Sequence, residues 1–145
     1  MKNIKQLFRI CLLVLALGSI PAAHAGMTQI PKPHRIIFQL VSGDTNAHKA
    51  LMKQLQNISS VAPDTRMEVV CHGPGLNMLT TQSIVAEKLQ TLMGKGIVFN
   101  ACEFSMQERK VDKAQILPGV GYVKAGILEI VEKQEQGWNY IKAGF

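Results

Sequence analysis

Short apolar runs and amphipathic segments alternate along the chain and predict strands and helices in turn. Residues 35–41 (RIIFQLV) form a compact β-branched run that ends at a Ser-Gly-Asp turn, which is typical of a buried strand. Similar runs predict four further strands, at residues 67–71 (MEVVC), 97–100 (IVFN), 120–123 (VGYV) and 138–143 (WNYIKA).

Between these runs, apolar residues recur at helical spacing. Asp44 is a good N-cap candidate for a first helix, whose inward residues are Ala47, Leu51, Leu55 and Ile58. A second helix is expected at about residues 77–93, where Gly94-Lys95-Gly96 ends it. The last helix is expected at 125–136. Leu128 and Val131 are expected to face inward. Glu129 and Lys133 are expected to form an ion pair on the outward side.

The order of these elements predicts the fold class. Strands that alternate with helices of this length imply an α/β fold with a parallel sheet covered on both faces, because parallel neighbours need crossover connections. In such sheets, binding and catalytic sites form beyond the carboxyl ends of the strands. Cys71 closes the second predicted strand and Cys102 follows the third, so both are expected at this edge.

The first 25 residues predict a secretory signal peptide. Three basic residues precede an apolar stretch at 10–20, and an Ala-His-Ala cleavage site precedes Gly26. A retained membrane anchor is the weaker reading, because a span needs about 20 apolar residues. We therefore expect a single domain at residues 26–145 and a periplasmic or secreted location.

Removal of this segment changes the charge and the cysteine content. It takes away three positive charges and no negative ones, so the formal net charge falls from +6 to +3. The remaining basic residues are scattered, which argues against nucleic acid as a partner, and no later stretch is apolar enough to span a membrane. Cys71 and Cys102 remain, in a compartment that permits a disulfide between them.

Cys102 is the stronger candidate for a reactive thiol. Ser105 and Glu108 have the spacing of a capping box, which predicts a third helix from Ser105 to about residue 115. Cys102 would then lie just ahead of the helix N-terminus, a setting that favours a thiolate. The negative charge of Glu103 opposes this. The alternative is that Cys102 is a small buried apolar residue.

Three roles remain open for Cys71: a core residue, a disulfide partner of Cys102, or a resolving thiol that attacks Cys102. A disulfide requires Cα atoms within about 7 Å of each other. Neighbouring strands are about 5 Å apart, so the bridge is feasible only if the second and third strands are adjacent. The sequence leaves that adjacency open.

His72 follows Cys71 directly and is a possible assistant to the thiol chemistry. It either acts as a base, stabilises a thiolate or simply caps a turn. The amides of Gly73 and Gly75 either face an anion or belong to a turn. We expect His34 and His48 to face solvent. The histidines and cysteines lack zinc-site spacing and no nucleotide-binding motif occurs, so neither a metal nor a cofactor is expected.

Four segments together resemble the DsrE/DsrF-like proteins across nearly all of residues 26–145. They are HRIIFQLVSGD, VVCHGPGLNML, GIVFNACEFSM and LPGVGYVKAGILEIVEKQEQGWNYIK. The most specific features are Cys102 followed by Met106, the Pro118-Gly119-Val120 turn and a Q-x-x-G-W-x-Y tail. The tail residues are Gln134, Gly137, Trp138 and Tyr140.

This resemblance implies a three-layer α/β/α sandwich around a five-stranded parallel sheet. It also implies a homo-oligomer, a trimer or hexamer. Several members of the family carry a persulfide on one cysteine and pass the sulfur to a partner protein. That cysteine matches Cys102, so the resemblance implies a sulfur carrier or sulfurtransferase with a sulfur donor or acceptor protein as partner.

Three functional hypotheses follow. The first is a sulfur carrier that uses Cys102 as the persulfide nucleophile, assisted by His72. The second is a periplasmic thiol–disulfide or redox-sensing module that uses Cys71 and Cys102. The third is a non-catalytic oligomeric binding protein in which both thiols are buried.

Overall fold

Strands and helices alternate along residues 33–144, the part of the chain that the computed structural model describes. The strands are β1 (Arg35–Leu40), β2 (Arg66–Cys71), β3 (Val98–Cys102), β4 (Gly121–Val123) and β5 (Asn139–Ala143). The α-helices are α2 (Thr45–Val61), α3 (Ala86–Met93), α4 (Glu103–Arg109) and α5 (Gly126–Glu135), and two 3₁₀ helices are η1 (Gly73–Leu79) and η2 (Lys113–Gln115).

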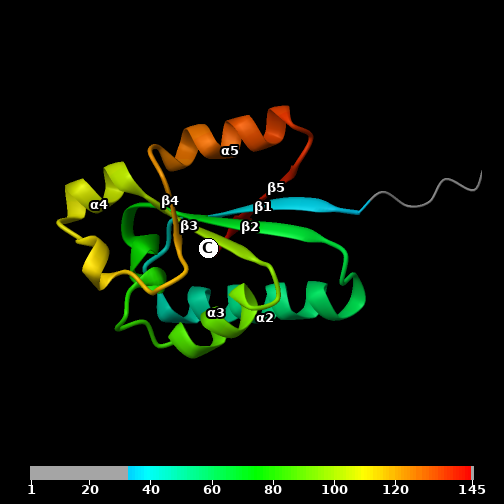
Figure 1. Cartoon of the computed structure of the whole chain (residues 1–145), viewed down its shortest axis with the longest axis horizontal. Coiled ribbons are helices and arrows are strands. Elements are labelled where there is room, and N and C mark those ends of the chain that lie inside the picture. Colours follow the sequence, from blue (N-terminus) through cyan, green and yellow to red (C-terminus); the bar gives the residue numbers. More distant parts are fainter. Residues whose placement is uncertain (1–32, 145) are drawn as a thin grey trace, which may run out of the picture. The chain divides into compact units, whose positions relative to one another are not determined.

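Within the described residues the strands form one parallel sheet of five, in the order β4-β3-β2-β1-β5. Helix α5 lies on one face of the sheet, and α2 and α3 lie on the other (Figure 1). This arrangement confirms the predicted α/β fold with a parallel sheet between helical layers. It also makes the second and third strands neighbours, which the sequence had left open.

The two faces of the sheet differ in character. The larger hydrophobic core lies on the face of α2 and α3 and includes Phe38, Leu51, Leu55, Val69 and Phe99, each at most 1% exposed. Burial of each such side chain contributes about 1.5–3 kcal/mol. The other core cluster is small: Ile37, Val70 and Ile130, with Val123 and Trp138 packed against it.

The second predicted helix, at 77–93, is wrong in its first half. The structure has the 3₁₀ helix η1, a turn, and then α3 from Ala86. The intervening segment is held by another part of the chain, because Thr80 forms an antiparallel bridge with Ile116 and the Thr81 amide donates to the Gln115 carbonyl at 2.8 Å. These tertiary hydrogen bonds replace the helical ones that apolar spacing predicted.

The predicted capping box at Ser105 is also wrong. Helix α4 begins at Glu103, with Cys102 at its N-cap, so Ser105 lies inside the helix. The Ser105 hydroxyl accepts from the Gly73 amide at 2.9 Å and so joins α4 to η1 instead of capping its own helix. Helix α4 also ends earlier than expected, at Arg109, because Lys110 adopts a left-handed conformation with φ 55°.

The phase of α5 differs from the prediction. Ile130 is the buried apolar residue of the helix, whereas Leu128 and Val131 are 55% and 42% exposed. Lys133 lies 3.4 Å from Glu129, as the spacing predicted, but both side chains also turn toward the buried carboxylate of Glu68 on β2. The ion pair between Lys133 and Glu68 lies on the sheet face that α5 covers, and this attraction fixes which side of α5 faces inward.

The prediction that His48 faces solvent is wrong. His48 is 2% exposed, and its Nε2 donates to the Ser42 carbonyl at 2.8 Å. Asp44 is confirmed as the N-cap of α2, since its carboxylate accepts from the Asn46 amide.

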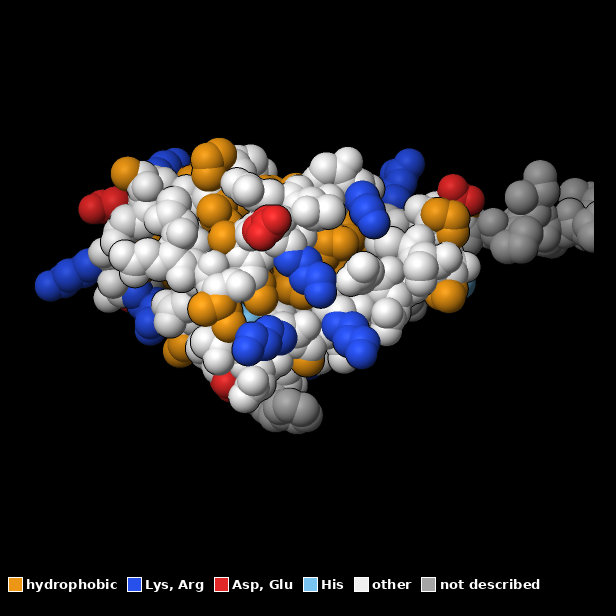
Figure 2. Space-filling model, turned by 90° about the horizontal axis from the view of Figure 1, so that it is seen from below, with side chains coloured by type: hydrophobic (Ala, Val, Ile, Leu, Met, Phe, Trp, Pro, Cys, Tyr) orange, Lys and Arg blue, Asp and Glu red, His pale blue; other side chains and the backbone are white. Residues whose placement is uncertain are grey.

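The surface on the side of α2 and α3 carries scattered charges. On this side, the lysine and arginine side chains are separated by neutral surface (Figure 2).

The predicted signal peptide, its cleavage site and Cys11 lie outside the described residues. None of the helices in residues 33–144 has the length and apolar character that a membrane crossing requires.

Candidate functional site

Cys71 and Cys102 end adjacent strands but belong to opposite faces of the sheet. Cys71 is paired in register with Ala101, so these two side chains share a face. Cys102 is the next residue along β3, and side chains alternate between faces along a strand. Accordingly, Cys71 and Ala101 belong to the core under α2 and α3, whereas Cys102 packs toward α5.

Cys71 has the surroundings of a core residue. Its side chain is fully buried, and burial raises the pKa of the thiol far above its usual value. Within residues 33–144 both cysteines are free thiols. The sheet itself separates them, so the structure does not bring Cys71 to Cys102 as either a disulfide partner or a resolving thiol.

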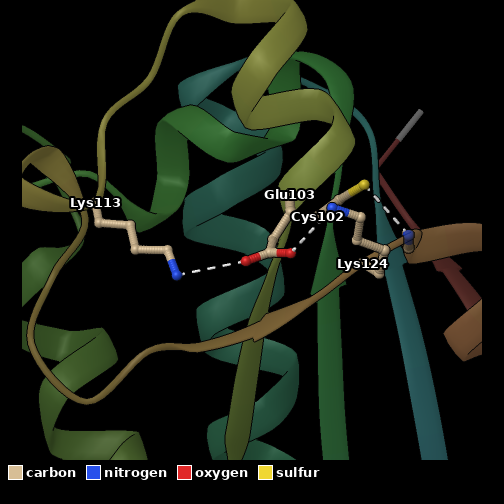
Figure 3. Close-up of polar contacts among 5 residues, drawn as sticks. Cys102, Glu103, Lys113 and Lys124 are labelled. Atoms are coloured by element: carbon tan, nitrogen blue, oxygen red, sulfur yellow. Dashed lines mark hydrogen bonds and ion pairs between the residues drawn. The ribbon is translucent and has the colours of Figure 1, made fainter.

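Cys102 lies where β3 ends and α4 begins, and its sulfur meets a second helix. The backbone amide of Gly126, the first residue of α5, donates to the Cys102 Sγ at 3.2 Å. The dashed line from the sulfur in Figure 3 marks this contact. An amide at a helix N-terminus stabilises negative charge on the group that it contacts. Cys102 is 4% exposed.

Gly126 allows this close approach because it has no side chain. A Cβ at this position would lie 3.0 Å from Val70 Cγ1, 3.3 Å from Cys102 Cβ and 3.4 Å from His72 Cβ. The same distances show that His72 and Cys102 flank one glycine. The structure therefore brings together two of the three predicted site residues, Cys102 and His72, on the face that α5 covers.

The His72 ring is hydrogen-bonded on one side. Its Nε2 lies 2.8 Å from Nε2 of Gln39, and Oε1 of Gln39 accepts from the Tyr140 hydroxyl. Burial lowers the pKa of His72 from its usual 6.5, so the imidazole is neutral at pH 7. Sequence reasoning missed Gln39 and Tyr140, because their contribution depends on the order of the strands.

The loop after His72 does not present free amides to an anion. The Gly73 amide donates to Ser105, and the Gly75 amide donates to the His72 carbonyl at 3.1 Å. Both glycines belong to η1, so the turn interpretation of this segment holds.

Glu103 is neutralised by two lysines. Its carboxylate lies 3.4 Å from the Lys113 ammonium and 3.8 Å from that of Lys124, as Figure 3 shows. The negative charge that the sequence places beside Cys102 is therefore offset. These three residues also line an open cleft of ≈ 490 Å³ whose other walls come from α4 and the segment after it.

A buried polar cluster holds α5 against the sheet. The Lys133 ammonium lies 2.6 Å from one oxygen of Glu68, and the other Glu68 oxygen accepts from Asn100 at 2.9 Å. Burial acts to lower the pKa of Lys133, but the hydrogen bond and charge of Glu68 outweigh it and the pKa is raised. Burial and the charge of Glu68 raise the pKa of Glu129.

No three His, Cys, Asp or Glu side chains gather closely enough in residues 33–144 to hold a metal ion. The chemistry available here is that of one thiol, one neutral imidazole and a helix N-terminus.

Comparison with known proteins identifies the family. The model of the DsrE/DsrF-like family matches residues 36–143. A protein of unknown function from Methanobacterium thermoautotrophicum, MTH1491, has a similar structure with 29% identity and a TM-score of 0.73, over 75% of this chain and 98% of that one. No match to a curated protein was found.

Two more distant structures share the fold. The ychN protein from E. coli matches with a TM-score of 0.61 and 10% identity, over 77% of this chain and 99% of its own. A conserved protein of unknown function from Bacteroides thetaiotaomicron, BT1422, matches with a TM-score of 0.63 and 11% identity, over 74% and 93%. Because the family model covers most of the chain, including both cysteine loops, this protein belongs to the DsrE/DsrF-like family.

Proposed function

We propose that the protein carries sulfur as a persulfide on Cys102. The observation that carries this proposal is the hydrogen bond from the first amide of α5 to the Cys102 sulfur. A thiol acts as a nucleophile in its thiolate form, and the amide at the helix N-terminus stabilises that negative charge. The resemblance to family members that relay sulfur supports the same residue.

The transfer step is an exchange of sulfur between thiols. The Cys102 thiolate attacks the outer sulfur of a donor persulfide, R–S–SH, and a new S–S bond forms as the donor S–S bond breaks. The donor leaves as the thiolate RS⁻, and Cys102 becomes the persulfide. No net oxidation takes place, so the step requires no cofactor. A second thiol, on an acceptor protein, takes the sulfur by the same reaction.

Intact-mass analysis tests the proposal directly. The folded protein is exposed to a low-molecular-weight persulfide, and the mass of one added sulfur atom is expected on the peptide that contains Cys102. Cys71→Ser is the matched control and is expected to load normally, whereas Cys102→Ser is expected not to load. The absence of an adduct on Cys102, while iodoacetamide still labels that residue, contradicts the proposal.

A second function has one specific observation in its favour. Cys102 is only 4% exposed and Cys71 is fully buried, as expected of a non-catalytic binding protein with two core thiols. Alkylation of the native protein separates the two functions. Sulfur carriage requires that Cys102 reacts while the protein stays folded, and the binding-protein alternative requires that neither thiol reacts before unfolding.

The protein is further proposed to form a homo-oligomer, a trimer or hexamer. Helix α5 supports this proposal, because Ile127, Leu128 and Val131 are 54%, 55% and 42% exposed. Apolar patches of this kind are often covered by another chain. Light scattering on the purified protein measures the oligomer, and Leu128→Lys is expected to lower its mass if α5 lies in the interface. A monomer at micromolar concentration contradicts the proposal.

We also propose that this chemistry takes place in the periplasm or outside the cell, which the signal peptide predicted from the sequence supports. Mass spectrometry of the N-terminus and cell fractionation test this proposal. A mature chain that begins near Gly26 and is recovered from the periplasm or the medium is the expected result. Recovery of the uncleaved chain from the cytoplasm contradicts it.

A further inference from the structure

A chain of hydrogen bonds crosses three neighbouring strands on the face that α5 covers. The Tyr140 hydroxyl on β5 donates to Oε1 of Gln39 on β1, and Nε2 of Gln39 lies 2.8 Å from Nε2 of His72, which follows β2 directly. The sheet order β5-β1-β2 places these three residues side by side. His72 is therefore connected, through Gln39, to a side chain two strands away.

The chemistry of the amide fixes the state of the imidazole. The Nε2 group of a glutamine is an NH₂ and only donates, so His72 must accept through the lone pair of its own Nε2. A neutral imidazole has one donor and one acceptor nitrogen, which leaves the ring proton on Nδ1. An imidazolium would point an N–H at the Gln39 NH₂ group, and two donors repel.

The Tyr140 hydroxyl contacts the oxygen end of the Gln39 amide, the end that does not face His72. The hydroxyl donates to the amide oxygen, and this contact leaves the amide nitrogen on the side of the imidazole. Loss of the hydroxyl removes this partner of the amide oxygen, so the orientation of the amide is then less restricted. The tautomer of His72 is therefore linked to a tyrosine that acts through Gln39.

We propose that Gln39 and Tyr140 are positioning residues that hold His72 as the neutral imidazole with its proton on Nδ1. The lone pair of His72 Nε2 is then occupied by the Gln39 amide, so His72 does not act as a proton-accepting base toward Cys102. The statement about the role of His72 toward Cys102 rests on the proposed function of Cys102, whereas the assignment of the tautomer does not.

The surroundings of His72 agree with a neutral ring. Burial lowers its pKa. The elements packed around it contribute the titratable groups Cys102 from β3 and Tyr140 and Lys142 from β5, where Lys142 pairs in register with Gln39. Helix α5 presents Gly126, which has no titratable side chain. No carboxylate among these residues stabilises an imidazolium.

Nuclear magnetic resonance of the ¹⁵N-labelled protein reads the tautomer directly. Long-range ¹H–¹⁵N correlations at neutral pH are expected to show the His72 proton on Nδ1. In Gln39→Glu, a carboxylate replaces the amide and only accepts, so the proton is expected to move to Nε2. The same carboxylate is expected to raise the pKa of His72 by about 1 to 3. Gln54→Glu, on the exposed side of α2, is the matched control and is expected to leave His72 unchanged.

Tyr140→Phe provides a second, milder variant that retains the aromatic ring. It is expected to give a mixture of the two His72 tautomers. Tyr122→Phe is the control and is expected to leave the single Nδ1 tautomer unchanged. The fingerprint spectrum of each variant verifies that it is folded. A wild-type ring with its proton on Nε2, or an unchanged His72 in both folded Gln39→Glu and Tyr140→Phe, overturns the proposal.

The experiment separates this inference from the proposed function. If Cys102 takes up no sulfur but His72 has its proton on Nδ1 and responds to Gln39→Glu, the positioning by Gln39 and Tyr140 stands and sulfur carriage fails. If Cys102 loads with sulfur and the Nε2 tautomer is found, sulfur carriage stands and the positioning fails.

Discussion

Cys71 and Cys102 end neighbouring strands, yet their side chains leave the sheet on opposite faces. Cys71 belongs to the core beneath α2 and α3, and Cys102 lies against the first residue of α5. This relationship decides between the roles that the sequence left open for Cys71, because proximity along the strand ends does not bring two thiols together through a sheet.

Mild oxidation is therefore expected to produce no intramolecular disulfide in the folded protein. The geometry of a disulfide requires that the two Cβ atoms point toward each other, and the alternation of side chains prevents that here. Mass spectrometry after treatment with oxidised glutathione, without reductant, measures the bond. The same treatment in denaturant is the control and is expected to allow it. A Cys71–Cys102 bond in the native sample contradicts the assignment of the two faces.

Gly126→Ala is expected to destabilise the protein by about 1–3 kcal/mol, because a methyl group at this position overpacks the junction of α5 with the sheet. The added Cβ would lie 3.0 Å from Val70 Cγ1. Urea unfolding measures the change. Gly94→Ala is the matched control, since its new Cβ comes no closer than 3.4 Å to any neighbour and its φ of −60° suits alanine. Equal effects of the two substitutions would show that Gly126 is not needed for close approach.

Glu68→Gln is expected to cost about 1–3 kcal/mol, because it removes the charge that pairs with Lys133 in a buried setting. The oxygen that accepts from Asn100 is retained, so the loss reports the ion pair. Glu129→Gln is the comparison and is expected to cost no more than about 0.5 kcal/mol, because burial and the charge of Glu68 already oppose the ionised form of Glu129 and so offset its pairing with Lys133 one helical turn away. Denaturant midpoints measure both changes. A larger loss for Glu129→Gln than for Glu68→Gln is inconsistent with this account.

His72 predicts a specific dependence of stability on pH. Burial lowers its pKa in the folded protein below the usual 6.5, so the unfolded chain binds the proton more readily. The stability that this difference contributes is present above pH 6.5 and is lost as the pH falls through the pKa of the folded protein. His72→Gln is expected to reduce this acid loss, whereas His34→Gln, at an exposed position, is not. Denaturant midpoints measured across this pH range test the prediction. An identical loss of stability at acid pH in the wild type and in His72→Gln excludes a contribution from His72.

The regular part of the fold was predictable because its signals are local. The run at residues 35–41 and the N-cap at Asp44 depend on a few adjacent residues, and the structure confirms both. The segments that differ are those in which distant contacts override local pattern. Thr80 bonds to a segment more than thirty residues away, and Ser105 uses its hydroxyl on Gly73 and not on its own helix.

In the candidate site, too, the residues with local signals were predictable and those that depend on distant contacts were not. The sequence identified Cys102 from its place after a strand, and it identified His72 from its neighbour. It missed Gly126, Gln39 and Tyr140, because their contribution appears only when the strand order and the docking of α5 are known. Two signals were available: Tyr140 belongs to the tail that resembles the family, and a glycine stands at the start of the predicted last helix, where it has no local capping advantage over serine or aspartate.

Helix α5 performs two tasks within ten residues. Its first amide contacts the Cys102 sulfur, and the next two residues, Ile127 and Leu128, are more than half exposed. The exposed apolar side chains and the amide that contacts the thiol are therefore consecutive in the sequence. Any movement of the start of α5 would therefore change both the contact to the Cys102 sulfur and the apolar surface that the protein exposes.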